Sequence, residues 1–363
     1  MSSTSNLSTL AAAFLTATLA AQAPQHQVVP ATYTNTDAVS YEWIAGASRD
    51  LRQQTLIGAS HLQGMIGHSI AAIELRRSAA NEVYQGGTAN LSVTLSTSPR
   101  VPLQCANVYQ QNIGPDALQV FSGLVTLPTS PIEVGPTVAW TANNIVRIAF
   151  TTPFLYQGGT LLVDIVGQPV AGQNANWWMA DAEFEDIKGT TQQVGQGCGV
   201  YGGPNHEWSH VAPRTLLPGG YARFWAFGPN NGFAIAAFGA ASPTPIPLSA
   251  FGMSTPGCNM HLQPGLVLST MVAMFEPETN PLLLAFGGIA EVRVHLPNDP
   301  WIFGMTLTTQ WLDISQQATS NAVQWTVASQ MPGLDMALVE GSPLDTTGEV
   351  SVHLAQIMRL EYQ

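Results

Sequence analysis

Basic residues are scarce in this sequence of 363 residues. Lysine and arginine together number 11, and Lys188 is the only lysine. Charged residues make up 9% of the chain, against about 25% in an ordinary soluble domain. A helical cytosolic enzyme normally coats its exposed faces with Glu and Lys, so this composition argues against that class of protein.

The scarcity of positive charge also bears on partners. The formal net charge is -12 and the isoelectric point is about 4.9. Phosphate backbones and anionic membrane surfaces are repelled by such a chain. We therefore expect no binding to nucleic acid.

Long hydrophobic runs are missing beyond the first residues, so we expect no membrane span. The exception is Leu10 to Ala23, an apolar stretch followed by a small-x-small cleavage pattern at Ala21 to Ala23. This arrangement predicts a signal peptide over residues 1–23, and hence a protein that is secreted or held at the cell surface. The segment before it, Met1 to Thr9, has no Lys or Arg, and an amphipathic or buried N-terminal helix is the alternative.

Cysteine is limited to three residues, so an oxidising compartment leaves one of them without a partner. Cys198 and Cys258 both lie in Gly-rich contexts in the second half of the chain. We expect these two to form a disulfide. Cys105 lies in an apolar segment and is predicted to be a buried thiol.

What the chain does contain is short alternating apolar segments separated by Gly and Pro turns. Its 33 Gly and 25 Pro punctuate a sequence in which long segments of helical period are scarce. Period two predicts strands at Ser69–Leu75, Ala89–Leu95, Val120–Leu127, Asn144–Phe150 and Thr160–Val166. Many short strands at this spacing indicate an all-β protein of sandwich or barrel type.

The second half shows the same pattern of short alternating apolar segments after a Gly-rich interruption over residues 189–199. We therefore predict two tandem β-sandwich, jelly-roll-like domains, at 24–189 and 190–363. Strands predicted at Tyr221–Phe227 and Phe233–Phe238 flank residues 228–232. A hairpin is expected across this turn, where Asn231-Gly232 tolerates positive φ. Trp225, Trp311 and Trp325 lie in alternating strands and are expected in the core.

Both halves of the chain contain short motifs that resemble those of a known kind of protein. The second half has Gly195-Gln196-Gly197-Cys198, Pro256-Gly257-Cys258 and Leu296-Pro297-Asn298-Asp299-Pro300, and the first has Arg52-Gln53-Gln54, Asn112-Ile113-Gly114-Pro115-Asp116 and Leu161-Leu162-Val163-Asp164. In these motifs the chain resembles two-module secreted proteins of planctomycete-type bacteria. The resemblance implies an exported all-β protein with its two glycine-flanked cysteines bonded. It implies no reaction.

One string has the form of a metalloprotease motif. Residues 206–210 read His-Glu-Trp-Ser-His, and zincins place such histidines on one helical face. Gly202 to Pro204 precede the string and Pro213 follows it, which leaves room for about two helical turns. A surface loop or strand is the competing interpretation, and His206 and His210 stay candidate metal ligands of a zinc hydrolase.

Three acidic residues share a period of two. Asp181, Glu183 and Glu185 would lie on one side of a strand, where oxygen ligands could hold calcium. A solvated strand face is the alternative.

Tryptophans near loops are candidates for glycan contact. Trp177 and Trp178 follow Asn176 in a Gly/Asn-rich loop, and exposed aromatic rings can stack on sugars. A core role is the alternative, because adjacent strand residues point to opposite faces.

A phosphate-binding Gly loop, CxxC metal spacing and an evident carboxylate pair are all missing from the sequence. We therefore expect an exported structural or adhesive protein without catalytic activity and without a resident cofactor. Its partners would be cell-wall or matrix glycan, or other surface proteins. A carbohydrate-binding protein that uses loop aromatics and a zinc hydrolase are the alternatives.

Overall fold

A computed structural model describes residues 23–173, 178–185, 189–201, 209–211, 216–229, 231–277 and 287–363. Within these ranges the chain forms strands and no α-helix, which confirms the all-β class. Its helical turns are short 3-10 segments, at η1 Ala31–Tyr33, η2 Ala59–His61, η3 Gln63–Met65, η4 Pro102–Gln104, η5 Tyr109–Gln111, η6 Gly199–Tyr201, η8 Leu248–Phe251 and η10 Pro300–Ile302. None of the described residues belongs to a helix that is long and apolar enough to cross a membrane.

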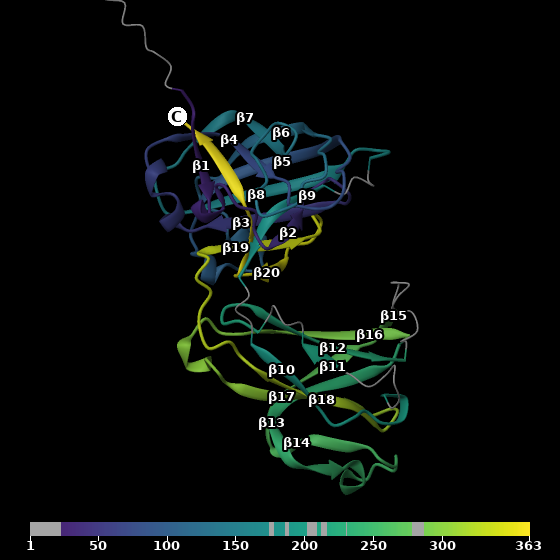
Figure 1. The fold of residues 1–363 in the computed structure, drawn as a ribbon. Helices are drawn as coiled ribbons and strands as arrows, with labels where there is room; N and C mark the ends of the chain where they lie inside the picture. Colours follow the sequence, from purple (N-terminus) through teal and green to yellow (C-terminus); the bar gives the residue numbers. More distant parts are fainter. Residues whose placement is uncertain are drawn as a thin grey trace, which may run out of the picture.

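The strands assemble into two bodies (Figure 1). We call residues 23–185 together with 329–363 the terminal module, because it contains both ends of the described chain. Residues 189–328 form the inserted module. In Figure 1 the terminal module is the upper body, with purple and blue strands, the teal strands β8 and β9 and the yellow strands of the C-terminus, and the inserted module is the lower body, with teal to yellow-green strands.

The terminal module contains three antiparallel sheets. The first has the order β1-β22-β4-β7 and the second the order β20-β19-β3-β8-β5-β6, while β2, β9 and β21 form the third. The strands are β1 Gln25–Val29, β2 Ser40–Trp43, β3 Leu51–Ile57, β4 Ser69–Arg76, β5 Gly87–Ser98, β6 Leu118–Leu127, β7 Ile145–Leu155, β8 Thr160–Pro169, β9 Met179–Phe184, β19 Met336–Gly341, β20 Glu349–Ser351, β21 Leu354–Gln356 and β22 Met358–Tyr362.

Alternation explains how these strands make a core. Along β5 the side chains of Ala89, Leu91, Val93 and Leu95 are buried, while the residues between them are less so. They join one large apolar cluster with residues of the facing four-stranded sheet, including Ile73. Two sheets that bury one face each against the other form a sandwich.

The inserted module contains two further antiparallel sheets. Their orders are β10-β18-β17-β13-β14 and β11-β12-β16-β15. The strands are β10 Thr190–Val194, β11 Ser209–Val211, β12 Tyr221–Gly228, β13 Phe233–Pro247, β14 Asn259–Met274, β15 Glu276–Pro277, β16 Gly288–His295, β17 Thr306–Asp313 and β18 Ala318–Thr326.

A separate apolar cluster fills the inserted module. Phe224 of β12 lies at its centre, with its ring 4.9 Å from Phe238 and 5.2 Å from Trp325. Trp311 and Trp325 are buried, as predicted, but Trp225 is only partly buried on the opposite face of its sheet.

The predicted division at 24–189 and 190–363 is wrong at its C-terminal end. Strand β22 lies between β1 and β4, and β19 lies between β20 and β3. Leu360, for example, pairs with Gln27 on one side and Ile73 on the other. The last residues therefore complete the sheets of the terminal module, and residues 189–328 are inserted between two parts of it.

The hairpin expected across residues 228–232 is also wrong. Asn231 does take the positive φ that the motif predicts, 61°. However, β12 pairs with β11 and β16, whereas β13 pairs with β14 and β17. The turn therefore carries the chain from one sheet to the other, because both strands bury an apolar face in the shared core.

Candidate functional site

The site begins with the alternation of two neighbouring strands in the inserted module. In β12 the small and apolar residues Ala222, Phe224 and Ala226 point into the core. The residues between them, Tyr221, Arg223 and Trp225, therefore lie on the outer face. Their antiparallel partners in β16 bring a second set of polar residues to the same face, in the pairs Tyr221–His295, Arg223–Arg293 and Trp225–Glu291.

An ion-pair network organises this face. The Arg223 guanidinium donates to Glu291 at 2.7 Å and stacks 4.9 Å from the centroid of the Trp225 ring. Arg293 and the indole N–H of Trp225 also donate to Glu291. Burial raises the pKa of Glu291, but the hydrogen bonds from Arg223, Arg293 and Trp225 outweigh it, so the pKa is lowered overall. Glu291 is therefore ionised at neutral pH.

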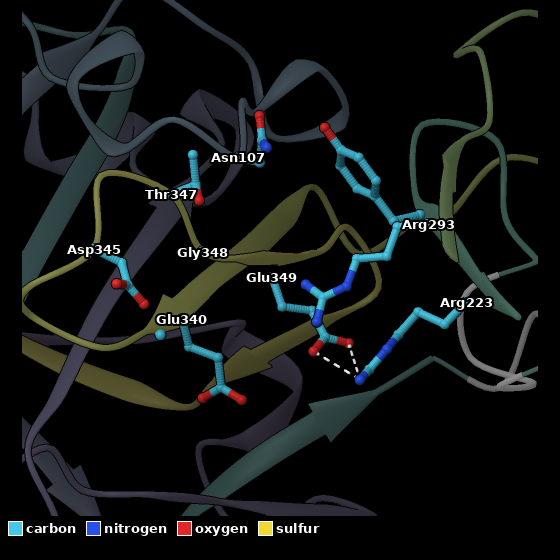
Figure 2. Close-up of a pocket in the computed structure, with 10 residues that line it drawn as sticks. Asn107, Arg223, Arg293, Glu340, Asp345, Thr347, Gly348 and Glu349 are labelled. Atoms are coloured by element: carbon cyan, nitrogen blue, oxygen red, sulfur yellow. Dashed lines mark hydrogen bonds and ion pairs between the residues drawn. The ribbon is translucent and has the colours of Figure 1, made fainter. Parts of the chain in front are cut away.

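The network continues into the terminal module. Arg223 donates two hydrogen bonds to Glu349 at the start of β20, at 3.1 and 2.9 Å. This ion pair lies between the modules (Figure 2). A second polar contact joins them nearby, where the Asn298 side-chain amide donates to the Leu103 carbonyl at 3.0 Å. Together these contacts fix one face of β12 and β16 against the terminal module.

A cleft of about 410 Å³ opens at this junction. Its inserted-module wall carries Tyr221, Arg223 and Arg293. Its terminal-module wall comes from the end of β19, the start of β20, the turn between them and a separate loop, and carries Asn107, Glu340, Gly341, Asp345, Thr347, Gly348 and Glu349 (Figure 2). Three carboxylates thus face two guanidinium groups across a polar cavity.

The predicted disulfide is confirmed. Cys198 and Cys258 are bonded, with their Cα atoms 5.1 Å apart, and close a loop of 60 residues in the inserted module. Cys105 is a buried free thiol, as predicted, and burial raises its pKa to about 12. A thiol with so high a pKa is a poor nucleophile.

The proposed glycan contact at Trp178 is wrong. This side chain is fully buried in the core of the terminal module, and its indole N–H donates to the Pro128 carbonyl at 2.9 Å. A ring enclosed on all sides cannot stack on a sugar. Asn176 and Trp177 lie outside the described residues. Trp301, in contrast, is 66% exposed.

The three acidic residues proposed as calcium ligands each have protein donors. Asp181 is buried, pairs with the equally buried Arg76 and accepts from the Ala38 N–H at 2.9 Å. Burial raises its pKa to about 6, although Arg76 acts in the opposite direction. Glu183 accepts from the Tyr33 hydroxyl.

Glu185 lies just after β9, where the chain leaves the terminal module. It accepts from the N–H groups of Gly333 at 2.8 Å and of Leu334 at 3.0 Å, in the segment by which the chain returns. Across the described ranges, no three His, Cys, Asp or Glu side chains form a group that could hold a metal ion. Calcium binding stays a prediction.

Only the end of the His-Glu-Trp-Ser-His string can be placed. His206 and Glu207 lie outside the described residues, as do residues 1–22 of the segment 1–23 predicted as a signal peptide. Ser209–Val211 form strand β11, in which His210 pairs with Trp225. His210 therefore does not lie on the helix that a zincin requires.

The cleft residues were missed from the sequence, although a signal for them was present. Residues 221–227 and 291–296 read as alternating strands whose apolar positions face the core. The same alternation places Arg223, Glu291 and Arg293 on the outward face. Charged residues make up only 9% of the chain, so three of them on one face of two neighbouring strands are a signal of a site. What the sequence did not indicate is that residues 340–349 return to face them.

No family model matches the chain. No curated protein matches it either. Among solved structures, the cryo-EM structure of T=1 Penaeus vannamei nodavirus matches at 11% identity, over 85% of this chain and 99% of that one, with a TM-score of 0.11. A TM-score that low carries no argument about fold or function. The resemblance to secreted planctomycete-type proteins stays a prediction.

Proposed function

We propose that the protein is an exported structural or adhesive protein that holds a ligand between its modules without transforming it. The observation that carries this proposal is that Arg223 of the cleft wall is held by two carboxylates, Glu349, which also lines the cleft, and Glu291, which lies next to it in the ion-pair network. Both Glu291 and Glu349 accept hydrogen bonds from Arg223.

Such pairing favours binding over acid catalysis. A general acid must hold its proton near neutral pH, which requires a raised pKa. Glu291, which does not line the cleft itself but holds Arg223 of its wall, has a lowered pKa instead. An ionised carboxylate held by a guanidinium is a fixed hydrogen-bond acceptor, and it positions a ligand rather than protonating it.

The composition supports a place outside the cytoplasm. Disulfides persist in oxidising compartments, and the inserted module has one. The surface is poor in lysine, and strand β10 exposes Thr190, Thr191, Gln192 and Gln193. A surface of neutral polar residues resists trypsin-like cleavage and suits contact with a wall or matrix.

The test is a paired measurement of binding and turnover on extracellular polymers. The full chain is incubated with a panel of glycans and matrix proteins, and both the retained polymer and any released products are quantified. We expect retention without products. Robust turnover of a defined substrate by the purified chain, lost when the cleft is altered, would contradict the proposal.

The cleft itself favours a second, more specific candidate, which is carbohydrate binding. Asn107, Thr347 and the Asp345 carboxylate offer donors and acceptors in a polar cavity, as sugar hydroxyls require. The net charge of -12 disfavours an acidic polysaccharide. The ligand class that fits is therefore a neutral oligosaccharide.

Three variants separate this site from its alternatives on a glycan array followed by calorimetry. Asp345→Asn should weaken binding about tenfold, because a hydrogen bond to a charged group contributes ~1.5–3 kcal/mol. Asp50→Asn removes the same charge from an exposed position outside the cleft and should leave affinity unchanged. Loss of binding in Trp301→Ala but not in Asp345→Asn would place the sugar on a loop aromatic and contradict the cleft.

A further inference from the structure

Strand β14 lies at the edge of the five-stranded sheet of the inserted module. In the part of the chain that the structure describes, its hydrogen-bonded neighbour is β13, on one side only. Edge strands expose backbone N–H and C=O groups that can pair with another chain, and proteins usually protect them with charged residues. Strand β14, Asn259–Met274, contains no Asp, Glu, Lys or Arg.

Exposed apolar residues lie at equal distances in sequence on both sides of Thr270 in this strand. Leu268 and Val272, two residues away on either side, are each 68% exposed. Leu266 and Met274, four residues away, are each 48% exposed. Thr270 itself is also exposed. An apolar row of this kind on a strand edge marks an interaction surface rather than a solvated face.

The charge distribution indicates which partner fits. From Phe224 to Phe275 the sequence has no Asp, Glu, Lys or Arg, whereas the whole chain has a net charge of -12. Two copies repel each other over most of their surfaces. They can approach along this uncharged segment with the least repulsion, so a second copy is electrostatically compatible there.

We propose that β14 pairs with β14 of a second copy of this chain, antiparallel, about a two-fold axis at Thr270. In this register Thr270 faces its own counterpart. Leu268 faces Val272 of the second copy, and Val272 faces its Leu268. Each apolar residue gains a cross-strand neighbour, and both strands gain backbone hydrogen bonds, as in β-augmentation. A two-fold axis makes the contact self-complementary and closed.

The pairing of this strand with β13 is irregular at three places. The register shifts between Phe238 and Gly239, opposite Leu268, and again between Gly239 and Ala241, opposite the stretch that includes Leu266. The third shift lies between Ala241 and Ile246. A bulge of this kind increases local twist. Leu266 and Leu268 both remain exposed, but the extra residue places Val267, and not Leu266, in register with the face of Thr270. The regular apolar row therefore runs from Leu268 to Met274.

Sedimentation velocity over a range of protein concentrations tests the pairing. We expect a reversible dimer of about micromolar affinity, since one strand edge buries little area. Added salt should strengthen it slightly, because salt screens the repulsion between two negative copies. A chain that stays monomeric at every concentration overturns the proposal.

Lysine substitutions locate the surface. Leu268→Lys with Val272→Lys places like charges opposite each other and should weaken the dimer at least about tenfold. Leu124→Lys is the matched control, because Leu124 is 66% exposed on β6, the edge strand of a terminal-module sheet. If Leu124→Lys weakens the dimer as much as the β14 variant, the proposed surface is wrong.

Single cysteines test the register, and they keep the test independent of the lysine variants. Thr270→Cys brings two thiols directly opposite each other, with Cα atoms about 4.5–5.5 Å apart, within the range for a disulfide. Ser269→Cys is the control, because Ser269 faces Met271 of the second copy in this register. Rapid cross-linking of Thr270→Cys alone supports the proposal, and equal cross-linking of both variants overturns it.

Discussion

At the scale of single residues, the same sequence pattern has three different outcomes in the structure. Asp181, Glu183 and Glu185 share a strand period, which predicts a common acidic face. In the structure Asp181 pairs with buried Arg76, Glu183 accepts from Tyr33, and Glu185 binds the backbone of the returning segment. Period two predicts the side of the strand, but the donors come from distant parts of the chain.

Glu185 joins the two segments that connect the modules, and its removal should loosen that connection. Glu185→Ala removes the acceptor of the Gly333 and Leu334 N–H groups. Their amide hydrogen exchange should accelerate about tenfold. A hydrogen bond to a charged group contributes ~1.5–3 kcal/mol, and exposure of the Glu185 carboxylate to solvent reduces that contribution.

Glu183→Ala is the matched control for this exchange measurement. Glu183 lies two residues earlier and accepts from Tyr33 instead, so the Gly333 and Leu334 amides should keep their rates. Unchanged exchange in Glu185→Ala would show that the carboxylate does not hold the returning segment.

At the scale of elements, alternation predicts strands well and their partners poorly. The segments expected at Ser69–Leu75, Thr160–Val166 and Tyr221–Phe227 coincide with β4, β8 and β12. Apolar residues at every second position need one buried face, and a strand provides it. The partner of a strand depends on the whole fold, which is why the hairpin expected at 228–232 does not form.

The cleft shows the same contrast between predicting a strand and predicting what it contacts. The outward direction of Arg223, Glu291 and Arg293 follows from two alternating strands, each of which the sequence predicts. The ion pair of Arg223 with Glu349 joins residues 126 positions apart. No local pattern in the sequence indicates such a contact, so the wall of the cleft could be predicted but not the cleft.

At the scale of the whole molecule, the central feature is one module inserted into another. Thr190, near the start of the inserted module, pairs with Thr326, near its end. A module whose ends meet in this way can fold as a unit, and its folded form holds the two segments of the terminal module close together. That proximity lowers the entropy cost of pairing β22 with β1, more than 300 residues away along the chain.

The nesting also explains why the cleft exists. Its terminal-module wall includes Glu340 to Glu349, which follow the inserted module in the sequence, and its other wall belongs to that module. A tandem arrangement with a boundary near residue 189 would give these residues to a separate domain. The strand orders exclude that arrangement for β19, β20, β21 and β22.

Thermal unfolding of three fragments, followed by near-ultraviolet circular dichroism, tests the nested arrangement most directly. We predict cooperative unfolding for residues 189–328 alone, and for a chain in which a short Gly/Ser linker replaces those residues. Residues 24–189 alone should not fold, because β19 and β22 are missing from the interiors of two sheets. Cooperative unfolding of residues 24–189 alone, together with failure of the linker chain, would contradict the account.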